Sequence, residues 1–209
     1  MVELLVVVAV VVVLAALLMP LMARSHVNSI RVRCVNNLKQ VGLAFRIWQQ
    51  DNGVYPMQYK TNDFDGPSYA SDKQMFMYFQ VISNELTNPK LVTCPEDFQR
   101  SAATNWDADF NSSHVGYFVG LNADDSGPSS LLAGDRNLAT GTVPKNGVLE
   151  ITTNQVSNLK NPAVHWTGEI HTNAGNILFA DSHVEQLTSA KLRQALRDSG
   201  LATNRQVLP

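Results

Sequence analysis

The sequence predicts an α+β protein with the shape of a ladle. One long N-terminal α-helix, with a hydrophobic half and an amphipathic half, packs on an antiparallel β-sheet head that carries one or two short helices. Two observations support this prediction: the first residues form an uninterrupted apolar run, and the later residues form short β-favouring segments separated by Gly, Pro, Asn and Asp. We divide the chain into a hydrophobic helix (1–26), the amphipathic half of the same helix (27–53) and a globular head (54–209).

The N-terminal apolar run covers residues 4–22, where no side chain is charged or strongly polar. Its length is close to the ~20 residues that a helix needs to cross a bilayer. A secretory signal carries basic residues ahead of its apolar stretch, whereas here Arg24 follows the run. Because the positive-inside rule taken literally would leave the head in the cytoplasm, we expect that a basic leader has been removed and that the head lies outside.

Apolar residues continue after the run at intervals of three and four, which predicts a helix with a single buried stripe. The stripe comprises Val27, Ile30, Cys34, Leu38, Val41, Phe45 and Trp48. Asn52-Gly53 and the following Tyr55-Pro56 predict the end of the helix, because glycine adopts the left-handed conformation without strain. Pro20 lacks an amide hydrogen, so we expect a kink or a melted turn just before it.

The head is predicted to begin near Val54. Ser71 and Gln74 fit a capping box for a short helix that holds Met75, Phe76, Phe79 and Ile82. An antiparallel sheet with long loops is predicted from β-favouring runs at 90–94, 115–121, 131–132, 148–152, 164–166, 176–180 and 183–187.

The C-terminal part is predicted to contain a hairpin and one more helix. Asp181-Ser182 lies between the last two β-favouring runs as a turn. Thr188 or Ser189 then caps a final helix with Leu192, Ala195 and Leu196 on its buried side. We expect the tail after Gly200 to be loosely held.

Charge and cysteine content restrict the possible partners and the compartment. A formal net charge of -2 gives no basic surface for nucleic acid, so no nucleic-acid partner is expected. Cys34 and Cys94 are too far apart in sequence for a CxxC pair. A disulfide between them would close a loop of ~60 residues, stabilise the head by about 4 kcal/mol and require an oxidising compartment. The alternative is two separate buried thiols.

Glu3 places a carboxylate directly ahead of the apolar run. Burying such a charge without a partner costs several kcal/mol, so a cation is expected near it once the helix is buried. In a polymer, that cation can come from a neighbouring copy. The alternative is that Glu3 lies among lipid headgroups.

The N-terminal quarter resembles type IV pilins and type II secretion pseudopilins after leader cleavage. The resemblance rests on MVELLVVVAV over 1–10, LAALLMP over 14–20, CVNNLKQVGLA over 34–44 and NGVYP over 52–56. It implies that Glu3 pairs with the N-terminal amine of an adjacent subunit and that Pro20 is the helix-breaking proline. The Phe-Thr pair that normally precedes the residues matching Met1 and Val2 is not part of this sequence, so the N-terminal amine that the family usually methylates is expected to lie outside it.

The C-terminal region resembles the same family. His171 is followed by nine residues and then Asp181-Ser182, similar to a "His, nine residues, Asp-Gly" signature of one bacterial branch. Ser182 replaces the glycine of that signature. Because serine tolerates positive φ poorly, the resemblance predicts the hairpin but leaves its turn type open.

Other chemistries are weaker interpretations of the sequence. Asp181, Ser182 and His183 include the residue types of a hydrolase triad, but no nucleophile elbow accompanies them, and we expect no enzyme. A metal at His165, His171, Asp181 and His183, calcium at Asp124-Asp125 or at Asp63 and Asp65, and a glycan at Asn111 are open alternatives, and we expect no cofactor and no metal.

The resemblance therefore predicts a structural subunit that polymerises into an extracellular type IV pilus-like filament. Its expected partners are further copies of itself, the inner membrane before assembly, and the pilus or secretion assembly machinery. The subunit would span the inner membrane once with its head outside the cytoplasm, and would lie at the cell surface after assembly. The alternatives are a pseudopilin of a periplasmic pseudopilus and a membrane-tethered ligand-binding module.

Overall fold

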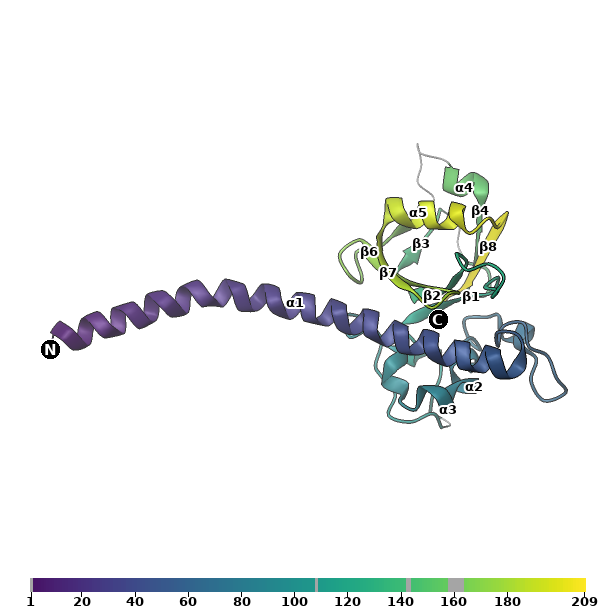
Figure 1. The fold of residues 1–209 in the computed structure, drawn as a ribbon, viewed down its shortest axis with the longest axis horizontal. Helices are drawn as coiled ribbons and strands as arrows, with labels where there is room; N and C mark the ends of the chain where they lie inside the picture. Colours follow the sequence, from purple (N-terminus) through teal and green to yellow (C-terminus); the bar gives the residue numbers. More distant parts are fainter. Residues whose placement is uncertain (1, 108, 142–143, 158–163) are drawn as a thin grey trace.

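The protein consists of one long helix and an α+β head in the computed structural model, which describes residues 2–107, 109–141, 144–157 and 164–209. The side chains of 18–28 are outside this description. Helix α1 spans Val2–Asn52, the predicted range, and is about 76 Å long at 1.5 Å per residue. Its N-terminal half extends away from the head and its C-terminal half crosses it (Figure 1).

The predicted stripe of α1 is the face that the head covers. Cys34, Leu38, Val41 and Phe45 are fully buried, and Trp48 is partly buried against the same core. The helix ends at Gly53, whose φ of 80° is left-handed and whose amide donates to Gln49 O at 2.8 Å. The position of Val27 in the stripe falls within 18–28 and is outside the described side chains. The melted turn expected before Pro20 is wrong, because α1 is a continuous helix over Val2–Asn52.

The head is built on a six-stranded antiparallel sheet in the order β4-β8-β1-β2-β6-β7. Its strands are β1 (Tyr117–Gly120), β2 (Leu131–Asp135), β4 (Val148–Thr152), β6 (Ala174–Phe179), β7 (Val184–Thr188) and β8 (Thr203–Val207). A two-stranded sheet pairs β3 (Leu138–Ala139) with β5 (His165–Trp166). The predicted antiparallel sheet is therefore confirmed, although most strand boundaries differ by a few residues.

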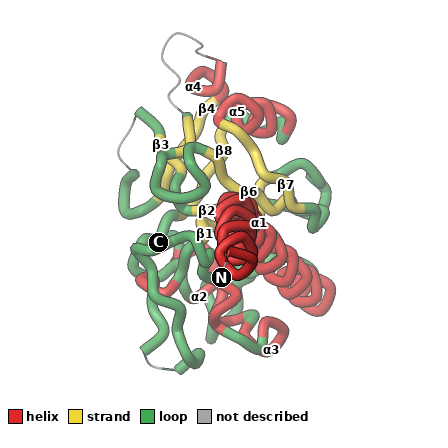
Figure 2. The backbone as a smooth tube through the Cα atoms, turned by 90° about the vertical axis from the view of Figure 1, so that its left-hand side faces the viewer, coloured by secondary structure: helices red, strands yellow, loops and turns green. Residues whose placement is uncertain are grey.

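The six-stranded sheet lies between α1 on one face and the last helix of the chain on the other (Figure 2). An apolar core fills each side of it. One core lies between the sheet and α1 and continues to the short helices α2 (Met77–Val81) and α3 (Ser83–Leu86). The other lies between the sheet and α5 (Ser189–Asp198), beside α4 (Thr153–Ser157). Helix α1 approaches the sheet closely at Gly42, where a Cβ would lie 2.6 Å from Leu178 Cδ1 of β6.

The first head helix begins later than the capping-box pattern predicts. Regular helix starts at Met77, and its N-cap residue, Phe76, makes no side-chain capping bond. The chain does turn at Ser71, whose carbonyl accepts from Gln74 N and Met75 N at 3.1 and 2.9 Å. The predicted capping box is therefore wrong, because Ser71 initiates a series of turns through its backbone.

The predicted strand at 90–94 is also wrong. Pro89–Val92 form the 3₁₀ helix η2, one of three such turns together with η1 (Gly66–Tyr69) and η3 (Ser112–His114). Pro89 begins η2, and the Asn88 side chain accepts from Lys90 N at 3.0 Å. Proline at the first helical position and asparagine as the N-cap favour a helical turn over an extended strand.

The C-terminal tail is not loosely held, which corrects the prediction for the residues after Gly200. It forms β8, which pairs with β4 on one side and β1 on the other. Asn204, Gln206 and Val207 are buried there. The final helix is confirmed, since Thr188 caps α5 by accepting from Lys191 N at 3.4 Å, and Leu192 and Leu196 are buried.

Candidate functional site: an exposed apolar helix and a buried polar cluster

Residues 2–17 of α1 form an apolar surface that no other described part of the chain covers. All side chains of residues 2–17 are exposed, and the large apolar ones among them are 52–73% exposed. Glu3 is the charged residue of this segment and has no ion-pair partner among the described residues. Within the part of the chain that the structure describes, no helix reaches the length and apolarity that crossing a membrane requires.

Helix α1 is attached to the head by the predicted disulfide. Cys34 of α1 and Cys94, which follows η2, are bonded, and both are fully buried. Next to them, the Asn37 side chain donates to Thr93 O at 3.2 Å. The covalent link therefore lies at the start of the segment over which the head covers α1.

A cluster of polar side chains surrounds this disulfide, with His171 at its centre. His171 is 1% exposed, and its Nε2 lies 3.4 Å from Cys94 Sγ. On the other side of the ring, Nδ1 lies 2.6 Å from Glu96 Oε2. Asn176 Nδ2 lies 2.9 Å from Nε2 and is a donor, so Nε2 carries the lone pair and Nδ1 carries the hydrogen that faces Glu96.

Asp135 completes the cluster at the end of β2. Its Oδ2 accepts from the backbone N and the side-chain Nδ2 of Asn176 at 2.6 and 2.9 Å, and lies 3.3 Å from His171 Nε2. Its Oδ1 is buried and has no hydrogen-bond partner. We call Cys34, Cys94, Glu96, Asp135, His171 and Asn176 the polar cluster.

Burial shifts the acid-base properties of the polar cluster. Complete burial raises the pKa of Asp135 to about 7, although the hydrogen bonds from Asn176 act in the opposite direction. Burial also lowers the pKa of His171, against the opposing effect of the Glu96 carboxylate. At neutral pH the His171 ring is therefore uncharged, in agreement with the hydrogen-bond pattern of its two nitrogens.

The loop that carries His171 has an unusual backbone. His171, Thr172 and Asn173 all have left-handed φ values, of 54°, 53° and 61°. The buried Asn137 side chain fixes this loop by donating to the carbonyls of Thr167, Ile170 and Ala174 at 2.9–3.1 Å. A backbone of this kind costs about 1–3 kcal/mol per residue and persists where the surrounding contacts determine it.

A second ionic group lies beside the polar cluster. Arg136 binds Asp97 through two hydrogen bonds, at 2.6 Å from Nε and 2.8 Å from Nη2, and also contacts Glu169 at 3.1 Å. Asp97 is buried, and its hydrogen bonds raise the pKa of Arg136. This pair joins the loop after Cys94 to the residue that follows β2.

We expect Arg136→Lys to lower the free energy of unfolding of the head by about 1.5–3 kcal/mol, the cost of one hydrogen bond to a buried charge. Lysine keeps the charge but cannot bind Asp97 through two nitrogens. The matched control is Arg205→Lys, because Arg205 pairs with Glu150 at the surface, where their side chains are 45% and 62% exposed, respectively. An exposed pair contributes about 0–1 kcal/mol, and chemical denaturation of both variants checks the difference. Equal losses would contradict the structural importance of the Arg136 pair.

The structure separates the other sequence-predicted site residues. His171 is buried in the polar cluster, whereas Asp181 and His183 are exposed and contact each other in the turn between β6 and β7. Ser182 adopts a left-handed φ of 71° in that turn, the position where the family signature has glycine. The hairpin is therefore confirmed, and His171 contacts Asn176 of β6 and Cys94, which lies outside the hairpin.

The remaining alternatives do not form clusters. His165 is exposed on β5, Asp125 pairs with Arg46 at 3.6 Å, and Asp65 pairs with Lys60 at 2.9 Å. Asn111 is exposed, and its side chain caps η3 by accepting from Ser113 N at 2.9 Å. Among the described residues, one group of possible metal ligands lies close enough to share an ion, namely Cys34, Cys94 and His171.

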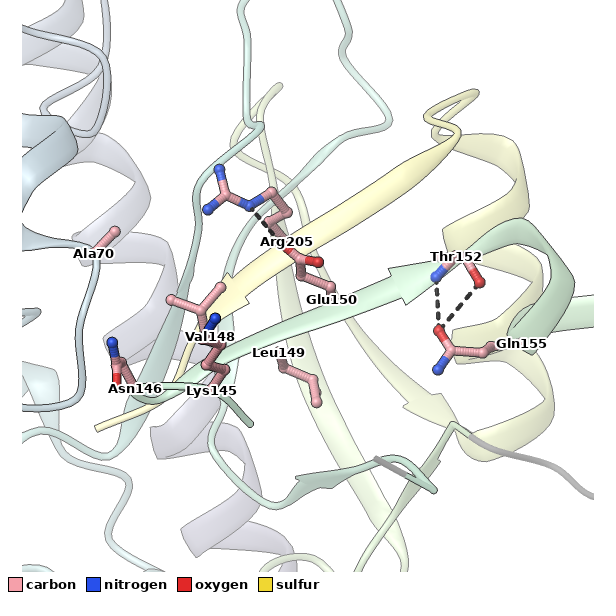
Figure 3. A pocket seen from close by; sticks show the side chains of 9 residues that line it. All are labelled: Ala70, Lys145, Asn146, Val148, Leu149, Glu150, Thr152, Gln155 and Arg205. Atoms are coloured by element: carbon pink, nitrogen blue, oxygen red, sulfur yellow. Dashed lines mark hydrogen bonds and ion pairs between the residues drawn. The ribbon is translucent and has the colours of Figure 1, made fainter. Parts of the chain in front are cut away.

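One pocket is an open groove at the edge strand β4, with a volume of about 670 Å³ (Figure 3). Its wall includes Lys145, Asn146, Glu150, Gln155 and Arg205. Glu150 and Arg205 pair with each other, and Gln155 Oε1 accepts from the backbone and hydroxyl of Thr152, as Figure 3 shows. These polar groups bind one another and do not converge on a common point.

No family model, curated protein or solved structure matches this chain. Sequence reasoning identified Cys34, Cys94 and His171 but did not predict that they meet. It also missed Glu96 and Asp135 as partners of His171. The available signal was weak: Glu96 follows Cys94 by two residues, and Asp135 ends a short apolar run.

Proposed function

We propose that this chain is the structural subunit of a type IV pilus-like filament and that it polymerises through the first half of α1. The observation that supports the proposal is the exposure of residues 2–17, an apolar helical surface without any cover from its own head. Burying one Val or Leu side chain contributes about 1.5–3 kcal/mol, so a helix with this surface needs either lipid or other helices around it. A bundle of identical helices provides such a cover.

The attachment of α1 to the head fits this role. A filament subunit has to hold its head while its helix exchanges one apolar environment for another. The buried stripe, the disulfide and the Arg46–Asp125 pair all bind the second half of α1 and leave the first half free. The disulfide further favours an oxidising compartment for the head.

On this proposal the subunit first spans the inner membrane with its head outside the cytoplasm. It then enters a cell-surface filament with the help of the assembly machinery. A pseudopilin of a periplasmic pseudopilus would use the same helix in the same way. Electron microscopy of filaments sheared from cells distinguishes the two roles, because a long surface homopolymer of this chain excludes a purely periplasmic one.

A membrane-tethered ligand-binding module receives less support. Ligand sites are mostly concave and apolar with a few convergent polar groups, whereas the groove in Figure 3 is open and its polar groups pair with each other. The helix of a tethered module would also need only lipid as its partner.

Glu3→Gln tests the proposal, and we expect it to reduce filament mass at least tenfold. If Glu3 is buried next to a cation of a neighbouring copy, losing its charge leaves that cation unpaired, which costs about 3–5 kcal/mol. The control is Glu185→Gln, which removes a carboxylate from an exposed pair with Lys191 on the head. Quantitative immunoblotting of sheared filaments against total subunit gives the readout. Normal filaments from Glu3→Gln would remove the support for polymerisation through this helix.

A further inference from the structure

The residues around the disulfide are arranged as metal ligands whose sulfur atoms are at present bonded to each other. Cys34 Sγ, Cys94 Sγ and a ring nitrogen of His171 all lie within 4.8 Å of one another, and the three residues are buried. Among the common divalent metal ions, zinc is one that favours thiolate and imidazole ligands of this kind. We propose that reduction of the Cys34–Cys94 disulfide converts this site into a zinc site with Cys34, Cys94 and His171 as ligands.

The orientation of His171 supports the proposal. Its Nε2 lies 3.4 Å from Cys94 Sγ and carries a lone pair that accepts from Asn176 Nδ2 in the disulfide form, so zinc would replace that hydrogen bond. Its Nδ1 lies 2.6 Å from Glu96 Oε2. A histidine that binds zinc commonly donates its other ring hydrogen to a carboxylate, which fixes the ring and makes the ligand nitrogen more basic. Glu96 lies next to Nδ1 in the disulfide form, and a small reorientation would align the hydrogen bond that these two atoms do not yet make.

One carboxylate lies beside these three residues but outside the group of side chains that are close enough to share an ion. The Asp135 carboxylate lies 3.3 Å from His171 Nε2, is fully buried, and has an oxygen, Oδ1, without a hydrogen-bond partner. The two cysteines and His171 therefore leave the fourth position of a tetrahedral zinc ion open, to be taken by a water molecule. Zinc bound in this way would keep α1 attached to the head after the covalent link is broken.

The chemistry requires a reductant from outside, either a dithiol or a phosphine. A phosphine takes the oxygen of one water molecule and becomes a phosphine oxide, while the two hydrogens of that water convert the disulfide into two thiols. Zinc then replaces the two thiol hydrogens, which leave as protons. The two sulfur atoms have to separate to about 3.8 Å, the distance set by two zinc–sulfur bonds of ~2.3 Å in a tetrahedron.

The disulfide lies behind the wall of a surface pocket. This pocket, with a volume of about 590 Å³, lies beside η2, and its wall includes Asn37, Thr93, Cys94 and Asp97. Because Cys94 itself is fully buried, a small reductant or an ion reaches its sulfur only when this wall opens locally. The route does not involve the first half of α1, so the proposal is independent of polymerisation.

Cobalt(II) binding to the full-length chain in detergent tests the proposal, because cobalt reports thiolate ligation by its near-ultraviolet charge-transfer absorption. After phosphine reduction we expect one cobalt ion per chain, displaced by one zinc ion, and no binding by the oxidised chain. His171→Gln is expected to weaken binding at least ~100-fold, and Glu96→Gln by ~10–100-fold as an outer partner. The matched control His183→Gln, in an exposed turn, should bind like the wild type.

The wild-type measurement needs no variant and decides the proposal even if a substituted chain fails to fold. The absence of cobalt binding by the reduced wild type would overturn the proposal, and so would equal binding by the oxidised chain. Undiminished binding by a folded His171→Gln variant would exclude His171 as a ligand and would also overturn it. None of these outcomes depends on whether filaments form.

Discussion

Replacing both Cys34 and Cys94 by alanine is expected to lower the free energy of unfolding of the head by about 4 kcal/mol. The disulfide closes a loop with a sequence separation of 60, and in the chain-entropy model such a loop restricts the unfolded chain by that amount. Both positions are fully buried, so alanine introduces no new polar group into the core. Guanidinium unfolding of the full-length chain in detergent, followed by tryptophan fluorescence, measures the loss.

The matched control is the wild-type chain after reduction in the presence of a metal chelator. It keeps both sulfur atoms and loses only the covalent bond, so it should show nearly the same loss as the double alanine variant. A much smaller loss in the reduced wild type would mean that the missing sulfur atoms, and not the crosslink, cause the effect. A loss below about 1 kcal/mol in both would contradict the chain-entropy argument for this loop.

The helix and its buried stripe were predictable because their signals are local. The three- and four-residue spacing from Cys34 to Phe45 and the Asn52-Gly53 stop define α1 without any knowledge of the head. The hairpin at Asp181-Ser182 and the cap at Thr188 likewise depend on neighbouring residues. The disulfide was predictable for a different reason, since the chain has two cysteines and one possible intramolecular pairing.

The misassigned segments are those in which distant contacts or neighbouring turn residues outweigh the apolar pattern. Strand β8 is mostly polar in sequence, and it is ordered by pairing with β4 and β1 on its two sides. The segment 90–94 has an apolar pattern typical of a strand, but Asn88 and Pro89 favour the 3₁₀ turn that forms. A count of β-favouring residues takes account of neither tertiary strand pairing nor N-terminal capping.

The polar cluster could not be predicted either, because its members are far apart in the sequence. His171 and Cys94 are 77 residues apart, and Asn176 and Asp135 are 41 apart. No spacing rule connects such residues, because the sheet topology brings them together. The sequence signature singled out His171. It did not indicate that the partners of His171 come from the loop after η2 and from the end of β2.

Phe45→Ala is expected to lower the free energy of unfolding by about 3–5 kcal/mol, the usual cost of removing a buried phenylalanine side chain. Phe45 is fully buried where α1 meets the head, and its ring centroid lies 6.4 Å from that of Tyr55 and 5.8 Å from that of Phe79. Alanine would leave a cavity between α1 and the segment that contains α2. The measurement is the same guanidinium titration of the full-length chain.

Leu43→Ala is the matched control, because Leu43 lies two residues away on the same helix and is 60% exposed. Its replacement should change the free energy of unfolding by no more than about 0.5 kcal/mol, as surface substitutions do. If the two variants lose similar stability, the head does not cover α1 along the Cys34-to-Phe45 face, and the separation of α1 into a covered half and a free half is wrong. If only Phe45→Ala unfolds easily, the head holds α1 by this face, which leaves the first half of the helix available for assembly.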